Sequence, residues 1–171
     1  NYYAFKAIYL HEMDRFRRTL MQSLLSPVLS TSLYFIVFGS VIGGYVQKID
    51  GISYGSYIVP GLLMLTLLTQ SISNTSFGIF FPKFNGTIYE ILAAPISTLE
   101  IVLAFVGAGA TKTLIVGLMI FLTSTFFVEV EVKYPLLMIF LLVLVSFTFA
   151  LFGFLIGLMS SNFEQMSIIP S

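Results

Sequence analysis

Long apolar stretches, separated by short polar segments, dominate this chain. Three stretches of at least 29 residues contain no charged side chain, and they run over residues 19–47, 51–82 and 134–163. A membrane-spanning helix needs about 20 predominantly apolar residues. The pattern therefore predicts four transmembrane helices, over about residues 20–45, 58–81, 101–127 and 136–158. Because proline favours the first turn of a helix, we expect Pro60 to open the second of them.

Residues 1–18 have a different pattern, that of an amphipathic helix. At 100° per residue one side carries an apolar stripe formed by Tyr2, Phe5, Tyr9, Met13, Phe16 and Leu20. Five polar or charged side chains lie off this stripe, namely His11, Asp14, Arg15, Arg17 and Arg18. Such a helix either packs on loops of the same protein or lies in the membrane interface, and the combination of aromatic residues with arginine favours the interface.

Composition supports a membrane protein and excludes several kinds of site. Hydrophobic residues make up 57% of the chain and charged residues 9%, with a mean hydropathy of +0.98; an ordinary soluble domain carries about 25% charged residues. With no cysteine and one histidine, thiolate chemistry and histidine-cluster metal sites are excluded. The formal net charge of zero gives no basic surface for nucleic acid. We therefore expect an all-α polytopic membrane protein, with an interfacial helix over 1–18 and a transmembrane domain over 19–171.

The basic residues that flank the predicted spans indicate an orientation. With the N-terminus in the cytoplasm, five basic residues lie inside and two outside, which agrees with the excess of Lys and Arg in cytoplasmic loops. Loops 46–57 and 128–135 are then external. Residues 82–100 form the one sizeable cytoplasmic loop.

That cytoplasmic loop contains a predicted short helix. Thr87 is followed three residues later by Glu90, which is the spacing of a capping box, and Pro95 ends the helix. Two turns are not stable alone in water, so the helix must dock on something, and its apolar side is formed by Ile88, Ile91 and Leu92. The docking surface is either the ends of the chain's own spans or another protein.

Four segments, in this order and spacing, resemble the permease subunit of ABC type-2 transporters, a bacterial class of exporter. They are the entry helix with Glu12, Arg15 and Phe16, the segment 33–39 (LYFIVFG), the segment 57–62 (YIVPGL) and the segment 86–97 (GTIYEILAAPIS). The resemblance covers the chain essentially end to end, and it is closest to short bacterial permeases.

The resemblance implies six spans in the complete permease, the fifth of which would start at about residue 165. It also implies a separate ATPase subunit that binds ATP and magnesium, a second permease subunit in a homodimer or heterodimer, and location in the bacterial inner membrane. Residues 1–18 resemble the connecting helix of such permeases. The loop helix resembles the coupling helix that seats on the ATPase, which assigns coupling to Gly86, Thr87, Glu90, Ile91, Leu92 and Pro95.

Polar side chains in the spans are candidates for the transport pathway. Thr66, Gln70, Ser73 and Asn74 share one face of the second span, where they either line a path or bond to neighbouring helices. The resemblance favours the path, because the second helix lines it in such permeases. Lys112 is the only charge inside a predicted span, and it either faces protein or water at depth or snorkels to the headgroups.

Small residues indicate where helices pack closely. Two pairs have the small-xxx-small spacing, Gly39 with Gly43 and Gly153 with Gly157. The segment 107–113 (GAGATKT) lacks the glycine that a phosphate-binding loop has directly before its lysine, so we expect no ATP site in this chain.

A secondary carrier and an intramembrane enzyme are the alternative classes of function. A secondary carrier would show inverted repeats and charged pairs at the midplane of the membrane. An intramembrane enzyme would need paired catalytic groups at depth. Neither pattern is visible, so the sequence predicts no catalytic residue, no metal site and no bound cofactor, and the exporter permease is the preferred interpretation.

Overall fold

The computed structural model describes residues 2–38, 48–49, 51–128 and 132–168. Its helices are α1 (Tyr2–Arg18), α2 (Leu20–Val37), α3 (Tyr54–Asn85), α4 (Ile88–Ala93), α5 (Thr98–Phe127), α6 (Pro135–Met159) and α7 (Phe163–Ile168). Two two-residue strands, β1 (Lys48–Ile49) and β2 (Ile52–Ser53), pair antiparallel ahead of α3.

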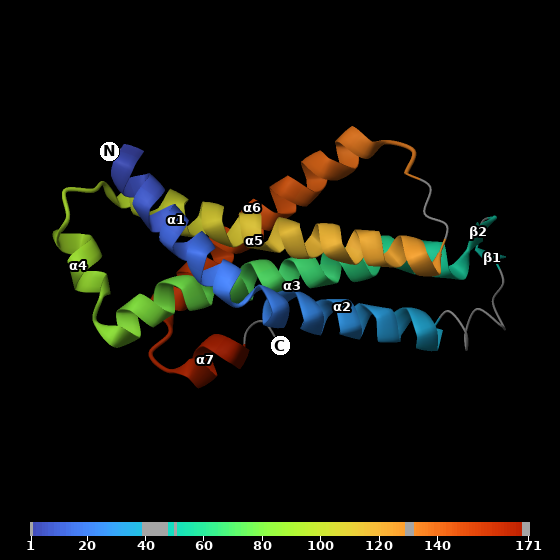
Figure 1. The fold of residues 1–171 in the computed structure, drawn as a ribbon, viewed down its shortest axis with the longest axis horizontal. Coiled ribbons are helices and arrows are strands. Elements are labelled where there is room, and N and C mark those ends of the chain that lie inside the picture. The colour runs from blue at the N-terminus through green and yellow to red at the C-terminus, as the bar shows by residue number, and fades with distance from the viewer. Residues whose placement is uncertain (1, 39–47, 50, 129–131, 169–171) are drawn as a thin grey trace.

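The long helices form an elongated bundle. Figure 1 shows α2, α3 and α5 running side by side along the long axis, with α4 at one end and the β1–β2 hairpin at the other. We call these the α4 end and the hairpin end. Helix α1 crosses α5 obliquely near the α4 end, and α6 packs on α3 and α5 there but diverges from them toward the hairpin end.

Four helices, α2, α3, α5 and α6, are long and apolar enough to cross a membrane. Large apolar side chains point outward from them, as with Phe126 at 87% and Leu136 at 83% exposure. Exposed apolar surface of this extent is typical of a surface that faces lipid. The prediction of an all-α polytopic membrane protein with four spans is confirmed.

Helix α3 begins and ends outside its predicted limits. It starts at Tyr54, where Ser53 is the N-cap and its hydroxyl accepts a hydrogen bond from the backbone N–H of Ser56. The prediction that Pro60 opens this span is therefore wrong, because the cap supplied by Ser53 sets the start six residues earlier. At the other end the helix passes Pro82 and stops at Gly86, whose φ of 80° is the left-handed conformation that glycine adopts readily.

The packing of α6 on α3 uses glycines. A Cβ on Gly153 would lie 2.5 Å from the carbonyl oxygen of Ile72, and one on Gly157 would lie 2.5 Å from that of Ser76. Four residues separate Gly153 from Gly157 on α6, and four residues separate their partners Ile72 and Ser76 on α3. The two helices therefore run in the same direction, with their backbones in contact. Lys83 ties the same region together, since its ammonium donates hydrogen bonds to two carbonyls at the C-terminus of α6, at 2.7 and 2.9 Å.

Two predictions fall largely outside the described residues. Helix α2 is described to Val37, so the predicted end of the first span at 45 and the pair Gly39 and Gly43 lie outside. The predicted start of a fifth span, at about residue 165, falls within α7, and residues after Ile168 are not described.

Candidate functional site: a polar cavity, an exposed loop helix and a buried ion pair

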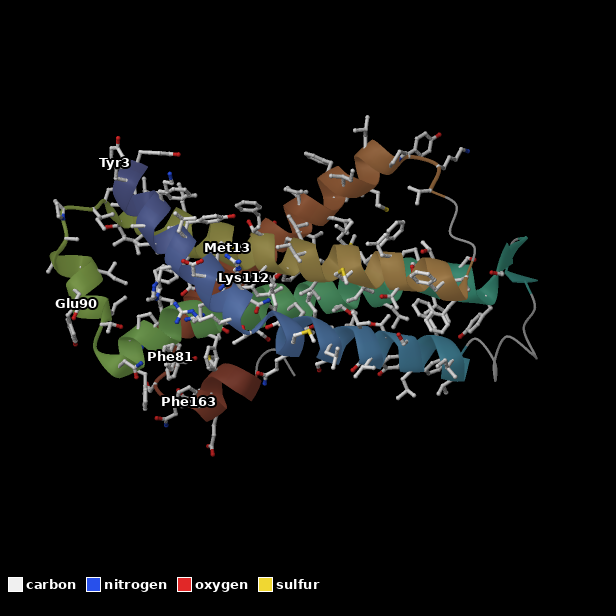
Figure 2. All side chains as sticks on the ribbon, in the orientation of Figure 1. Tyr3, Met13, Phe81, Glu90, Lys112 and Phe163 are labelled. Atoms are coloured by element: carbon white, nitrogen blue, oxygen red, sulfur yellow. The ribbon has the colours of Figure 1, made fainter. Side chains whose placement is uncertain are left out.

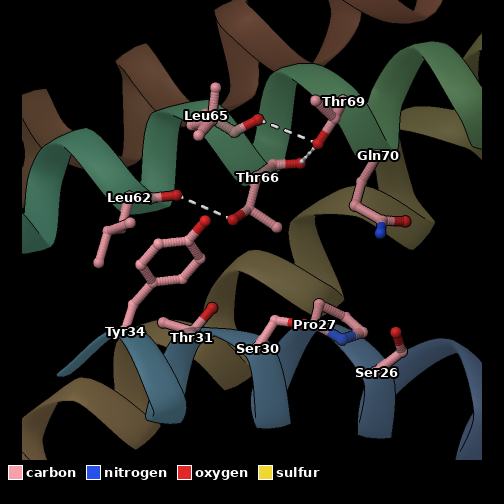
Figure 3. A pocket seen from close by; sticks show the side chains of 10 residues that line it. All are labelled: Ser26, Pro27, Ser30, Thr31, Tyr34, Leu62, Leu65, Thr66, Thr69 and Gln70. Carbon is pink, nitrogen blue, oxygen red and sulfur yellow. Dashed lines mark hydrogen bonds between the residues drawn. The ribbon is translucent and has the colours of Figure 1, made fainter. Parts of the chain in front are cut away.

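A polar cavity lies between α2 and α3. Its volume is about 210 Å³, and it is lined by Ser26, Pro27, Ser30, Thr31, Tyr34, Leu62, Leu65, Thr66, Thr69 and Gln70. Figure 3 shows Tyr34 reaching from α2 toward α3, and Gln70 reaching from α3 toward α2. None of these side chains is charged, so the cavity offers hydroxyl and amide groups to a ligand and no ionic contact.

Hydroxyl groups on the α3 wall are held by their own helix. Thr66 Oγ1 donates to the carbonyl of Leu62 at 2.8 Å, and Thr69 Oγ1 bonds the carbonyls of Leu65 and Thr66 at 3.1 and 3.2 Å. Their protons are thus used within α3. Each oxygen keeps acceptor capacity, so this wall can accept hydrogen bonds from a guest.

The predicted lining residues of α3 divide into two groups. Thr66 and Gln70 lie in the wall of the cavity. Ser73 and Asn74 are half-buried outside the lining set, where Asn74 Nδ2 donates to Gln70 Oε1 at 3.4 Å and Ser76 Oγ donates to the carbonyl of Ser73. Whether any of them lines a transport path stays a prediction.

Sequence reasoning missed the α2 wall. Ser26, Ser30 and Tyr34 follow one another at intervals of four residues, which places them on one face of the first span. That spacing is as regular as the one noticed in the second span. It could have been found in the same way.

Lys112 does not stand alone, which corrects the interpretation of an isolated charge. Its ammonium lies 2.7 Å from Glu12 Oε2 on α1, and the two residues are 3% and 2% exposed. Arg15 approaches the same oxygen at 3.0 Å. Lys112 therefore joins α5 to α1 where the two helices cross (Figure 2), and it is not among the residues that line the cavity.

The surroundings of Glu12 are shaped to hold its carboxylate. Gly78 of α3 faces it, and a Cβ there would lie 3.3 Å from Glu12 Oε2. Next to the pair, Tyr9 on α1 donates a hydrogen bond to Thr111 Oγ1 on α5 at 3.0 Å. Glu12 thus sits at a junction of α1, α3 and α5.

The contacts of α1 show which of its sides is buried. Glu12 and Phe16 are its buried residues and Tyr2 is 70% exposed, and α1 packs on α5. Position 12 falls between Tyr9 and Phe16 at spacings of three and four. A charge within the apolar stripe was the signal for a buried ion pair.

The loop helix α4 has one side on the bundle and one side exposed. Ile88 and Ile91 pack against the core at the α4 end, whereas Tyr89 and Leu92 are 73% and 63% exposed. Figure 2 shows Glu90 on α4 pointing away from the bundle, and it forms no ion pair with any residue that the structure describes. Of the predicted coupling residues, Ile91 therefore faces the chain's own core, and Leu92 and Glu90 face outward.

The predicted capping box at Thr87 and Glu90 is wrong. Thr87 has helical dihedral angles and no side-chain cap bond, because its hydroxyl turns back to the carbonyl of Pro82 at 3.4 Å. The capping box that the structure contains begins α5: Glu100 N–H donates to Ser97 Oγ at 3.3 Å, and Ser97 N–H donates to Glu100 Oε2 at 2.9 Å. This Ser-x-x-Glu pattern was equally visible in the sequence.

Among the described residues, no group of three His, Asp or Glu side chains lies close enough together to hold a metal ion. The fold and its polar features thus define a multi-pass α-helical membrane protein with an uncharged cavity between two spans and a loop helix exposed at one end.

The chain belongs to the ABC-2 type transporter family, whose sequence profile matches residues 3–171. It is 37% identical over 168 residues to the inner membrane transport permease YadH of Escherichia coli strain K12, and equally to YadH of Shigella flexneri. The alignment covers 98% of this chain and 66% of each relative, so the chain spans just under two thirds of their length. No solved structure matches it. The resemblance noted in the sequence is confirmed.

Proposed function

We propose that this chain is the membrane permease part of an ATP-driven exporter of the bacterial inner membrane, and that a separate ATPase subunit binds and hydrolyses the ATP. Membership of the ABC-2 type transporter family and similarity to a relative named as a transport permease support this function. In this proposal a second permease subunit, identical or homologous, completes the pathway.

The observation that carries the proposal is the outward face of α4. Six residues cannot form a stable helix alone in water, so α4 depends on its flanks, which are the C-terminus of α3 and the capped N-terminus of α5. Its exposed Tyr89 and Leu92 offer an apolar surface with an acidic side chain between them. A force applied to this face reaches two membrane-spanning helices directly.

The α4 end is proposed to be cytoplasmic. The excess of basic residues near the N-terminus supports this orientation. Because the 171 residues contain no cysteine, single cysteines introduced at Lys48, Asn85 and Lys133 can be labelled with a membrane-impermeant maleimide on intact cells. We expect labelling at Lys48 and Lys133 and none at Asn85, and labelling at Asn85 from outside would refute this orientation.

Mechanistically, ATPase closure moves α4 and thereby the ends of α3 and α5, and the bundle alternates between inward-open and outward-open forms. The cavity between α2 and α3 is the proposed contribution of this chain to the pathway. Its walls lack charge, so cargo is held there by hydrogen bonds and packing. No residue of this chain is assigned covalent chemistry.

Copurification and transport together test the partnership. We expect the full-length protein to copurify with a cognate ATPase subunit, and transport in vesicles to stop when ATP is removed. A secondary carrier would continue to transport in vesicles that contain an ion gradient but no ATP or ATPase. An intramembrane enzyme would convert a substrate instead of moving it. Either result would replace the exporter proposal.

A further inference from the structure

The ion pair between Glu12 of α1 and Lys112 of α5 joins two residues that are 100 positions apart in sequence. Lys112 lies 14 residues after the start of α5, which corresponds to about 21 Å along the helix axis. The pair is therefore a connection well inside the bundle, away from the exposed face of α4. Both side chains are almost completely buried, at 2% and 3% exposure.

A buried pair of this kind resists separation of the helices that it joins. If α1 moved away from α5, Lys112 would lose its carboxylate partner while its ammonium remained buried, which is strongly unfavourable. An apolar contact would be different, because apolar side chains can slide past one another with little loss. A buried ionic contact thus holds α1 in one position relative to α5.

Helix α1 leads directly into a wall of the cavity. Thr19 is the single residue between α1 and α2, and its backbone bonds both ways, to the carbonyl of Phe16 at 3.0 Å and from the N–H of Ser23 at 2.9 Å. The hydroxyl of Thr19 also bonds the carbonyl of Arg15 at 3.2 Å. This joint is therefore stiff, and Ser26, the first cavity residue of α2, follows it within two turns.

The opposite wall of the cavity is fixed differently. Helix α3 is packed backbone to backbone on α6 through Gly153 and Gly157. Contacts between α2 and α3 are few, whereas α2 and α1 both lie against α5. A shift of α5 relative to α3 therefore changes the width of the cavity only if α2 follows α5.

We infer that the Glu12–Lys112 ion pair is the link by which α5 carries α1, and with it the α2 wall of the cavity, so that Glu12 and Lys112 are positioning residues for transport. This role rests on the proposed function, in which the ATPase moves α4 and the base of α5. Motion entering at α4 reaches α2 along α5 by two routes, the direct packing of α2 on α5 and the route through the pair, α1 and the joint at Thr19.

The choice of variants that test the link depends on Arg15, which contacts Glu12 beside Lys112. Exchanging the two charges would place a lysine beside Arg15, so a charge swap is unsuitable. Glu12→Gln leaves Lys112 without its carboxylate, and the double variant Glu12→Gln/Lys112→Met removes both charges. Tyr9→Phe is the matched control, because it removes one hydrogen bond at the same helix contact without touching the charges.

The first measurement needs no ATPase. Spin labels on cysteines at the exposed Leu10 of α1 and Leu103 of α5 report the separation of these helices in the full-length protein in lipid nanodiscs. We expect one narrow distance distribution for the wild type and Tyr9→Phe, and a distribution at least twice as broad for the double variant. A double variant as narrow as the wild type overturns the link, whatever the fate of the ATPase partnership.

The second measurement follows the cavity walls with labels at the exposed Leu33 of α2 and Tyr57 of α3, in complex with the cognate ATPase. ATP with vanadate should shift this distance in the wild type and in Tyr9→Phe. We expect the double variant to lose at least half of the shift while its ATPase rate stays within twofold of the wild type. A full shift in a well-folded double variant overturns the positioning role and leaves the proposed function intact. If no ATPase copurifies, the proposed function is overturned instead, and the first measurement alone decides whether the pair links α1 to α5.

Discussion

Replacing single glycines by alanine should separate the contacts between α3 and its neighbours according to their closeness. The sharpest case is Gly153→Ala. The new methyl group would lie 2.5 Å from the carbonyl oxygen of Ile72 and 2.8 Å from its Cα. Both are backbone atoms, which cannot rotate away as the end of a side chain can, so α3 and α6 must move apart.

The size of the effect follows from two opposing contributions. Overpacking a close contact costs about 1–3 kcal/mol. The gain in helix propensity from Gly to Ala returns at most about 1 kcal/mol. With the full gain subtracted, we expect Gly153→Ala to lower the free energy of unfolding by about 0–2 kcal/mol. Gly157→Ala should behave alike, since its methyl group would lie 2.5 Å from the carbonyl oxygen of Ser76.

Two further glycines provide the controls. Gly61 lies in α3, and no atom of the residues that the structure describes comes within 4 Å of its would-be Cβ, so Gly61→Ala should be neutral or slightly stabilising. At Gly109 the nearest atom is the side-chain hydroxyl of Thr75, which has no hydrogen-bond partner among the described residues and can rotate, so Gly109→Ala should cost less than Gly153→Ala.

The assay is reversible unfolding in mixed micelles of mild detergent and sodium dodecyl sulfate, followed by circular dichroism. The full order expected is Gly61→Ala most stable, then Gly109→Ala, then Gly153→Ala and Gly157→Ala. Equal stability of Gly153→Ala and Gly61→Ala would refute the close backbone contact between α3 and α6.

Three other predictions concern polar side chains. Ser97→Ala should destabilise the protein by about 0.5–2 kcal/mol because it removes the N-cap of α5. Thr87→Ala removes no cap and should change stability less in the same unfolding assay, so the reverse order would contradict the assignment of the cap to Ser97. Glu90→Gln should lower transport per ATP hydrolysed about two- to fivefold, since the exposed carboxylate caps nothing and is left to pair with the ATPase; unchanged coupling in reconstituted vesicles would contradict that pairing. Glu12→Gln should lower the free energy of unfolding by about 3–5 kcal/mol, because it leaves the buried Lys112 without its partner. Glu12→Gln/Lys112→Met removes both charges of the pair and should recover most of that loss, so additive effects in a double-mutant cycle would contradict the ion pair.

The spans could be predicted because each depends on a local run of apolar residues. Helix α6 was expected over 136–158 and is found at Pro135–Met159, where proline at the first position and the end of the apolar run coincide. Helix α3 was less well bounded, because an interior proline is tolerated in membrane helices and gives no reliable boundary. Its ends depend on Ser53 and Gly86, single residues whose capping role is decided by backbone angles.

The candidate site could be predicted only in part. Thr66 and Gln70 were found because they share one helix face, which is a property of a single segment. The polar face of α2 with Ser30 could have been found in the same way. Periodicity does not state which faces meet, however, so neither the pairing of the two walls nor the contact of Lys112 with Glu12 follows from it.

The charge pattern of the sequence predicts part of the ion pair between Glu12 and Lys112. A buried charge requires a partner, so Lys112 within an apolar span and Glu12 within an apolar stripe each predict an opposite charge nearby. Among the eight acidic residues of the chain, Glu12 lies at helical spacing between the apolar Tyr9 and Phe16, which makes it a candidate partner. What the sequence could not supply is that α1 crosses α5 at this level, and that Gly78 of α3 leaves room for the carboxylate. Those facts depend on the packing of three helices at once, and they make the pair a connection between helices as well as a neutralised charge.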